Sequence, residues 1–214
     1  MAEHTTGLAH HFEDMDQQRE TATLGMWAFL ITEVLFFGGM FTAYIVYRYQ
    51  YPVAFVEGSH HLDMMMGAIN TAVLICSSLT MALAVRAAQV NQRTQIIVFL
   101  VLTIVLGAVF LGIKGMEYHH KYVEHLIPGP SFHAASLAGP QVQLFFSLYF
   151  AMTGMHAFHM VIGIGLMVWM IARSSLGHFS SDYYAPVEMV GLYWHFVDIV
   201  WIFLFPLLYL LGKH

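Results

Sequence analysis

The chain has 214 residues, of which 58% are hydrophobic, 15% are aromatic and only 10% are charged. Soluble domains carry about 25% charged residues, so this composition excludes an ordinary soluble protein. The formal net charge is −5, and the sequence contains no cluster of basic residues, so we expect no nucleic-acid partner. The sequence therefore predicts a chain that is embedded in a membrane.

Long apolar runs dominate the chain from residue 24 onward. They cover residues 24–47, 64–85, 94–113, 142–172 and 189–211. At ~1.5 Å of rise per residue, a helix of about 20 residues crosses a hydrocarbon layer of ~30 Å. The predicted fold is therefore all-α, a polytopic membrane bundle of five transmembrane helices with the two chain ends on opposite sides of the membrane.

The segments outside these runs are short and polar. Residues 1–23 are acidic and lack the basic start of a signal peptide, so we interpret them as a polar N-terminal arm before a single transmembrane domain over 24–214. Residues 114–141 are long enough to form an irregular cap over one end of the bundle. The Lys and Arg residues divide four to four between the two predicted sides, so their count does not orient the chain.

The first apolar run contains a glutamate, Glu33, in the stretch ITEVLFFGGMF. An ionisable group at the centre of a membrane helix costs roughly 2.5 to 3.5 kcal/mol on insertion scales. Burial disfavours the ionised form, so we expect a protonated carboxyl unless a cation lies nearby. Glu33 is then a proton-handling group, a hydrogen-bonding group toward a neighbouring helix or subunit, or a neutral packing residue.

Two further apolar runs carry polar side chains at helical spacing. In 64–85, Asn70 and Ser77 are seven positions apart and are expected to share an inward face. In 142–172, His156 and His159 are expected to share a face as well, because residues three apart are neighbours on a helix.

The last run has the densest polar pattern. Glu188, His195 and Asp198 fall on one helix face at spacings of seven and three. Asp198 also lies within one turn of Trp194 and Trp201, whose indole N–H groups need acceptors when they are buried. We therefore expect the Asp198 carboxyl to accept hydrogen bonds from these two indoles.

Three functions are compatible with these polar groups. The first is a haem held by two histidines, for example His159 with His195, which requires both rings at one depth on facing helices. The second is a proton or ion relay through Glu33, His156, His159 and Asp198, as in a transporter. The third is an interhelical hydrogen-bond network, which small residues at close helix contacts support. Such small residues are Gly38, Gly39, Ala43, Gly154, Gly163 and Gly165.

The remaining candidate ligands do not form a metal pattern. The loop histidines show no pair of i, i+4 spacings opposite a second pair, and the stretch YHHKYVEHL is interpreted as an extension of the preceding helix. The single cysteine, Cys76, lies in an apolar run and is expected to be a small buried hydrophobic residue. No metal site and no catalytic residue are predicted in this chain.

The sequence resembles a known protein family. Five stretches stand in the order and spacing of subunit III of the haem-copper terminal oxidases, namely FLITEVLFFGGMF, INTAVLICSSLT, LGAVFLGIKGMEY, MTGMHAFHMVIG and YWHFVDIVWIFLF. The resemblance covers about Gly25 to Gly212 and is to the five-helix form of this cytochrome c oxidase subunit III family. The chain departs from it at Lys114, where glutamine is usual, at Ala157, where glycine is usual, and in YYAPV before Glu188.

The resemblance implies an accessory role in aerobic respiration. In the family, haem, copper and the proton pump belong to the partner subunits, and subunit III itself holds no cofactor. It packs directly on subunit I, with subunit II and further respiratory-complex subunits nearby, and it binds structural phospholipid. It supports proton uptake, oxygen access and the durability of the active site. The chain would thus be part of an enzyme, a proton-translocating terminal oxidase, without being catalytic alone.

The resemblance also assigns residues and orientation. Glu33 matches the family's intramembrane glutamate. The predicted lipid or interhelical network comprises Glu33, Asn70, His156, His159, Glu188, Trp194, His195, Asp198 and Trp201. The family topology implies a bacterial inner membrane, with the N-terminus in the cytoplasm and the C-terminus in the periplasm. Quinol oxidases and a nitric oxide reductase accessory protein are the alternatives within the family, and Glu33 favours the cytochrome c branch because the quinol-oxidase relatives often have a shorter acid there.

Overall fold

The structure, a computed structural model, describes residues 12–130, 132, 141–176, 179 and 183–210. This part of the chain is helical and contains no strand. Its elements are α1 (Met15–Gln50), α2 (Pro52–His60), α3 (Met64–Gln89), α4 (Arg93–Val123), α5 (Gln141–Ser175), α6 (Ala185–Phe205) and a π-helical turn, η1 (Pro206–Leu210). Five helices are long and apolar enough to cross a membrane, namely α1, α3, α4, α5 and α6 with its π-helical turn. The predicted fold class is confirmed.

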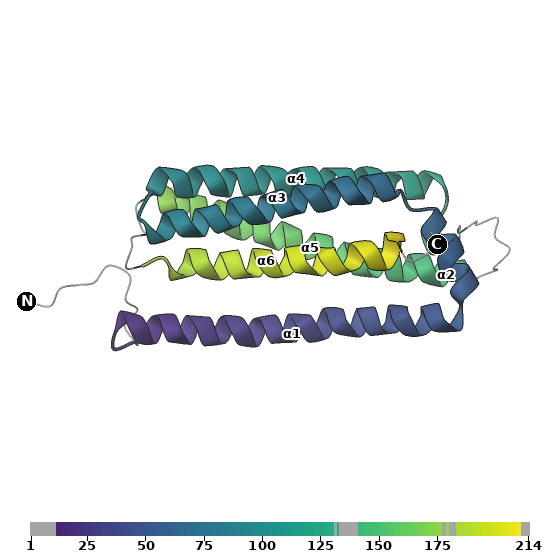
Figure 1. Ribbon diagram of the computed structural model, residues 1–214, viewed down its shortest axis with the longest axis horizontal. Helices are drawn as coiled ribbons and strands as arrows, with labels where there is room; N and C mark the ends of the chain where they lie inside the picture. Colours follow the sequence, from purple (N-terminus) through teal and green to yellow (C-terminus); the bar gives the residue numbers. More distant parts are fainter. Residues whose placement is uncertain (1–11, 131, 133–140, 177–178, 180–182, 211–214) are drawn as a thin grey trace, which may run out of the picture.

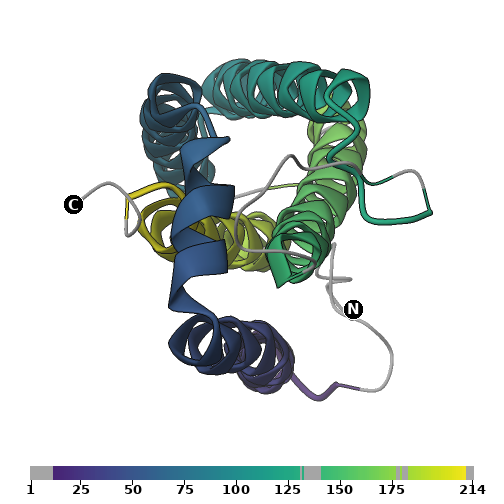
Figure 2. The ribbon, with the colours of Figure 1, turned by 90° about the vertical axis from the view of Figure 1, so that its right-hand side faces the viewer.

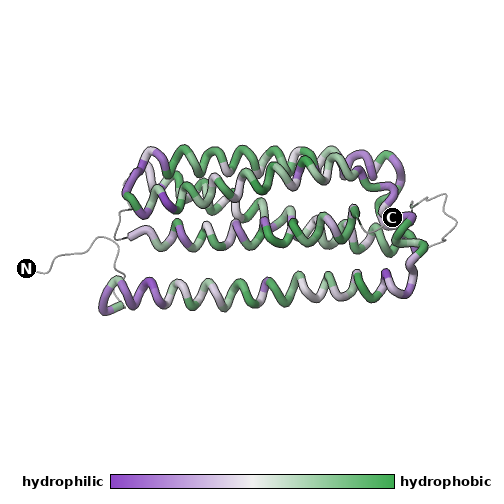
Figure 3. The backbone as a smooth tube through the Cα atoms, viewed as in Figure 1, coloured by the Kyte–Doolittle hydropathy of each residue, from purple (hydrophilic) through white to green (hydrophobic). Residues whose placement is uncertain are grey.

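The long helices run side by side along one axis (Figure 1). Helices α3, α4, α5 and α6 form a closed ring in which each helix contacts the next, while α1 lies outside the ring against α6 and α5 (Figure 2). The short helix α2 crosses one end of the bundle and packs on α5. Apolar residues dominate the middle of the long helices, and polar residues gather toward their ends (Figure 3).

Helix α1 begins earlier than its apolar run predicts. Asp14 caps it, because the Asp14 carboxylate accepts a hydrogen bond of 2.7 Å from the backbone N–H of Gln17. Residues 15–23, predicted as part of the polar arm, are therefore the first turns of α1, and residues 1–11 lie outside the described residues. A helix has no need to stop where its apolar stretch stops, because its first turns extend into the polar headgroup layer.

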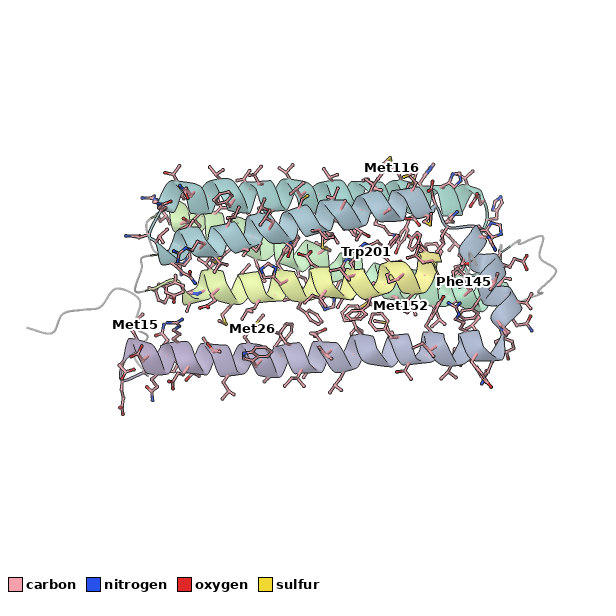
Figure 4. The ribbon with its side chains drawn as sticks, viewed as in Figure 1. Met15, Met26, Met116, Phe145, Met152 and Trp201 are labelled. Atoms are coloured by element: carbon pink, nitrogen blue, oxygen red, sulfur yellow. The ribbon has the colours of Figure 1, made fainter. Side chains whose placement is uncertain are left out.

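A single seam attaches α1 to the ring. The buried residues of α1 are Leu30, Phe37 and Tyr44, which are spaced by seven positions. A seven-residue repeat keeps one stripe of a helix facing its neighbour over several turns. The other faces of α1 carry exposed apolar residues, and Met26 lies on the side that faces α6 (Figure 4).

The predicted cap over 114–141 is partly helix. Helix α4 continues to Val123, so Lys114 and Glu117 lie inside a helix and are buried. The interpretation of YHHKYVEHL as a helix extension is confirmed up to that residue. Residues 133–140 lie outside the described residues. Helix α2 was not predicted; it starts at Pro52, a residue whose fixed φ suits the first turn of a helix.

Close packing within the ring depends on two glycines beside Trp194. A Cβ atom added to Gly163 of α5 would lie 2.7 Å from Cε3 of the indole, and one added to Gly107 of α4 would lie 2.9 Å from its Cη2. The indole of α6 is therefore wedged between α4 and α5. The expectation of close contacts at Gly38, Gly39 and Gly165 is wrong, since an added Cβ there would meet nothing within 4 Å.

Cys76 also corrects a prediction. Its side chain is exposed on the outer surface of α3 and is not buried in the bundle. An apolar run predicts a membrane helix but does not tell which of its faces is turned toward lipid.

Candidate functional site

A carboxyl–imidazole pair joins α1 to α5. Oε2 of Glu33 lies 3.1 Å from Nε2 of His159, and the two side chains are 18% and 9% exposed. Nδ1 of His159 lies 2.8 Å from the carbonyl oxygen of Met155. A carbonyl only accepts hydrogen bonds, so Nδ1 carries a proton. Nε2 therefore either accepts a hydrogen bond from a neutral Glu33 carboxyl, or carries a proton and donates a hydrogen bond to the Glu33 carboxylate. The pair has no net charge in either form.

Aromatic rings enclose this pair. The ring of Phe37 on α1 lies 5.2 Å from that of His159, edge to face. Tyr193 of α6 stacks on His159 at 6.4 Å, and its hydroxyl donates a hydrogen bond of 2.9 Å to the His159 carbonyl. Phe29 of α1 also stacks on Tyr193, with the ring centres 6.0 Å apart. Three helices therefore meet around one polar pair in an apolar setting.

A second polar cluster fills the bundle toward the end where α2 crosses. Nζ of Lys114 donates hydrogen bonds of 2.9 Å to Glu117 Oε2, 3.0 Å to Tyr149 Oη and 2.9 Å to Tyr209 Oη. The two tyrosine hydroxyls donate in turn to Glu117 Oε1, at 2.8 Å and 2.6 Å. The ammonium uses all three of its donors, and the carboxylate accepts on both oxygens. The network is closed and joins α4, α5 and the π-helical turn.

Aromatic faces complete the surroundings of the Lys114 ammonium. Its nitrogen lies 5.5 Å and 5.2 Å from the ring centres of Tyr118 and Trp201, whereas it meets Tyr149 and Tyr209 at their hydroxyl oxygens. Cations are attracted to aromatic faces at such distances. Sequence reasoning missed this cluster because it assigned Lys114 to a connecting segment. The signal was present, since Lys114 and Glu117 are three positions apart in a continuing helix, but the two tyrosines come from remote positions.

Six of the nine residues predicted for the network fall into three groups, and the other three contact hydroxyl groups of α3. Glu33 and His159 form the pair already described. Glu188 lies in the first turn of α6 and pairs at 3.7 Å with Arg19 of α1, so it does not join His195 or Asp198. The side chains of Asn70, His156 and Asp198 are buried and have no hydrogen-bond partner among the described residues.

The two predicted indole contacts of Asp198 are wrong. Nε1 of Trp194 donates to Ser77 Oγ at 3.2 Å, and Nε1 of Trp201 donates to Thr71 Oγ1 at 3.1 Å. Both acceptors lie on α3. The partners of the two indoles are therefore set by how α3 and α6 are aligned against each other, and the spacing of residues within α6 does not predict them. The expectation that Asn70 and Ser77 face inward is confirmed, as both are fully buried.

The histidines of the membrane helices do not come together as one site. His156 lies among rings, 5.4 Å from Phe110 and 5.2 Å from Trp201. Both ring nitrogens of His159 are engaged, as shown above, and Nδ1 of His195 lies 2.8 Å from Ser78 Oγ. Among the residues that the structure describes, no three His, Cys, Asp or Glu side chains are placed to hold a metal ion.

An apolar groove separates α1 from α6. It has a volume of about 480 Å³ and is lined by residues that include Trp27, Val34, Phe41 and Phe203. Trp27 also lines an adjoining hollow with Arg19, whose side chain is half exposed. The groove thus leads from the middle of the bundle to a polar hollow near its end, where Asp16 and Glu20 lie beside Arg19.

The helices and clusters together define an all-α, multi-pass integral membrane protein whose polar groups join its helices. The sequence matches the protein family described as cytochrome c oxidase subunit III over residues 3–213. The chain therefore belongs to the cytochrome c oxidase subunit III family and is a subunit III of a haem-copper oxidase, which confirms the resemblance. The complex that this family serves is an oxidoreductase, and subunit III has no redox cofactor of its own.

Similar proteins come from both branches of the oxidases. Cytochrome c oxidase subunit 3 of Synechocystis sp. is 33% identical over 97% of this chain and 82% of its own length. The protein of the same name from Thermostichus vulcanus is 34% identical over 97% and 96%. Cytochrome bo(3) ubiquinol oxidase subunit 3 of Pseudomonas aeruginosa is 28% identical over 96% and 92%.

Proposed function

We propose that this chain is the accessory, non-redox subunit of an oxygen-reducing, proton-pumping cytochrome c oxidase, and that it packs directly on subunit I, with subunit II in the same complex. The observation that carries the proposal is the family match along the whole bundle. The proposed location is a bacterial plasma membrane, with the N-terminus in the cytoplasm and the C-terminus outside. Haem and copper are then held by the partner subunits.

Cytochrome c is the proposed electron donor. The two cytochrome c oxidase subunits are 33% and 34% identical to this chain, and the ubiquinol oxidase subunit is 28% identical. A quinol oxidase remains the second candidate because its subunit also matches over nearly the whole chain. A haem-bearing membrane anchor finds no support in the geometry, because both nitrogens of His159 already have partners.

The groove between α1 and α6 is the proposed site for a structural phospholipid. Its lining is apolar apart from His195, which suits an acyl chain. Trp27 lines both the groove and the polar hollow at its end, which Arg19 shares with Asp16 and Glu20. Aromatic residues of this kind are common at the level of lipid headgroups. The lipid would fill the space along the weakly attached helix α1.

The Glu33–His159 pair supports proton uptake indirectly in this proposal. The pair holds one proton between two atoms and has no net charge in either form. Adding or removing a proton would create a net charge in a low-dielectric setting, which is costly. We therefore assign the pair to holding α1 in place beside the oxidase, so that the surroundings of the proton entry path and the active site keep their shape.

The test is purification of the tagged chain from native membranes in a mild detergent. A reduced-minus-oxidised spectrum and oxygen consumption with reduced cytochrome c are measured on the product, and the spectrum is repeated after the partners have been stripped away. The proposal expects haem bands and oxygen consumption in the complex and a colourless isolated chain. A haem band in the isolated chain, or a product without any haem subunit, would overturn it. Oxygen consumption with a quinol but not with cytochrome c would assign the chain to the quinol branch.

A further inference from the structure

A second groove lies between α3 and α6. Its volume is about 390 Å³, and its wall is apolar apart from Thr71, Ser78, His195, Asp198 and the edge of an indole. Most of these polar groups satisfy one another or a neighbour, since Ser78 pairs with His195 and the Thr71 hydroxyl accepts from an indole. Asp198 is the exception, because it is 4% exposed and neither carboxyl oxygen makes a hydrogen bond of good geometry with a described residue; the Ser78 hydroxyl lies beside it but is already engaged with His195.

This groove lies near the middle of the membrane span. Asp198 is well inside the 26 residues that run from Ala185 to Leu210, and Ser78 is similarly placed within Met64–Gln89. At ~1.5 Å per residue, about 18 Å of helix separates Asp198 from either end of its span. A lipid headgroup at the edge of a ~30 Å hydrocarbon layer does not reach that depth. An acyl chain can fill the groove, but it has no donor to offer the carboxyl.

We propose that this groove is a docking site for a transmembrane helix of another subunit of the oxidase, which presents a hydrogen-bond donor side chain to Asp198. The inference rests on the proposed function, since it requires that the chain is part of an oxidase. The complementarity is specific: the groove offers an unpaired acceptor at mid-membrane depth, and inside a membrane a polar side chain of a neighbouring helix is the usual partner of such a group.

The rim of the groove fits the apolar remainder of such a helix. Ile75 and Leu79 of α3 and Ile199 and Ile202 of α6 line the same groove as Asp198 and are 56%, 62%, 51% and 47% exposed. An interface in which exposed apolar side chains encircle one buried polar contact excludes lipid and water from that contact. The partner helix is thus expected to be apolar around a single donor.

The first experiment is photo-crosslinking in the assembled oxidase. A benzophenone amino acid replaces Leu79 or Ile202 at the groove, and Val105 or Val109 on the outer face of α4 serves as the matched control, since both are exposed apolar residues within a membrane helix. The inference expects crosslinks from both groove positions to a membrane-spanning peptide of another oxidase subunit. Lipid adducts alone at both groove positions, or subunit crosslinks from α4 alone, would overturn it.

The second experiment tests the donor. Asp198→Asn keeps an acceptor oxygen and is expected to retain the chain in the purified oxidase within about twofold of the native amount, whereas Asp198→Leu should lower that retention about tenfold. Ile202→Trp, which fills the rim and leaves the polar groups untouched, should lower it to a similar extent without changing the thermal unfolding of the isolated chain. Native retention of both Asp198→Leu and Ile202→Trp would overturn the docking site. A complex that purifies with all subunits but shows no groove crosslinks removes only this inference, while a chain that never purifies with a haem subunit removes the proposed function as well.

Discussion

Glu33 and His159 are 126 positions apart in the sequence, and their side chains meet at 3.1 Å between Oε2 and Nε2. Their contact is one of the polar links between α1 and the rest of the bundle, with the Arg19–Glu188 ion pair and the hydrogen bond from the Tyr44 hydroxyl to the Leu207 carbonyl, beside a seam of only three buried residues on α1. Because the Met155 carbonyl fixes a proton on Nδ1 of His159, the pair accommodates either a neutral acid or an ion pair without a net charge.

The first prediction concerns Glu33→Gln. The glutamine amide can donate to Nε2 of a neutral His159, so we expect oxidase assembly and oxygen consumption to stay within about twofold of native, as for a hydrogen bond that is replaced and not lost. Glu33→Leu leaves Nε2 without a partner and should cost about 1 to 3 kcal/mol of stability. Thermal unfolding of the purified complex measures both effects. A sharp loss of proton uptake in Glu33→Gln with intact assembly would instead make Glu33 a proton-handling carboxyl.

The second prediction concerns the closed network around Lys114. Lys114→Met leaves the Glu117 carboxylate buried without its cation, and breaking a buried pair in this way costs about 3 to 5 kcal/mol. Lys114→Gln restores the residue usual in the family and keeps donors for the carboxylate, so its cost should be smaller. Unfolding of the isolated chain in detergent provides the comparison.

Lys121→Met is the matched control for that network. Lys121 pairs with Glu124 at the same i, i+3 spacing, but the Glu124 side chain is 35% exposed and also contacts His120. Water therefore compensates much of the loss, and the destabilisation should be well below that of Lys114→Met. Equal effects of the two substitutions would contradict the view that the closed network stabilises the bundle.

The third prediction concerns the wedge at Trp194. Gly163→Ala brings a methyl group to 2.7 Å from the indole, so α5 and α6 must shift, and overpacking of this kind costs typically about 1 to 3 kcal/mol. Gly165→Ala is two residues away on the same helix and meets nothing within 4 Å. We expect a lowered melting temperature for the first variant and a native one for the second. Two native melting temperatures would show that the ring tolerates wider spacing.

The fourth prediction concerns the pH dependence at the end of α4. Partial burial tends to raise the pKa of Glu124, but the hydrogen bond and charge of Lys121, together with His120 and His61, outweigh it and lower the pKa. A carboxyl whose pKa is lower in the folded state stabilises that state above its unfolded pKa of about 4.3, and this contribution is lost as the pH falls through the folded value.

Comparison with Glu124→Gln isolates that contribution. The difference in melting temperature between the native chain and Glu124→Gln should shrink as the pH falls below about pH 4.3, where the carboxylate that attracts Lys121 is lost. A difference that grows as the pH falls in that range would have the opposite sign and would contradict the lowered pKa.

The membrane helices were predictable because apolar length alone decides which segments cross a bilayer. The ends of these helices were harder to predict. Helix α1 starts at Met15 because of the Asp14 cap, and α4 reaches Val123 through residues that a hydropathy pattern assigns to a connection. The short helix α2 has too few apolar residues for a span and depends on packing, for example of Phe55 on Phe145 at 5.5 Å.

For the polar residues, the sequence predicted which face of a helix they occupy, but it did not predict their partners on other helices. Spacing within one helix correctly turned Asn70 and Ser77 inward, but it could not tell that Ser77 accepts from Trp194, because that contact depends on the register of two helices. The Lys114 cluster likewise draws its tyrosines from α5 and the π-helical turn, 35 and 95 positions away. Contacts of such sequence separation leave no local pattern.

The position of Trp194 has a consequence for how the protein is made. Its indole fills the space between Gly107 and Gly163, and its helix is the last of the described helices to leave the ribosome. Until then α3, α4 and α5 form an open trough whose glycine-lined faces have no partner, and the ring closes only when α6 enters it. A chain cut short before α6 would therefore expose the faces of α4 and α5 that the indole covers in the complete bundle.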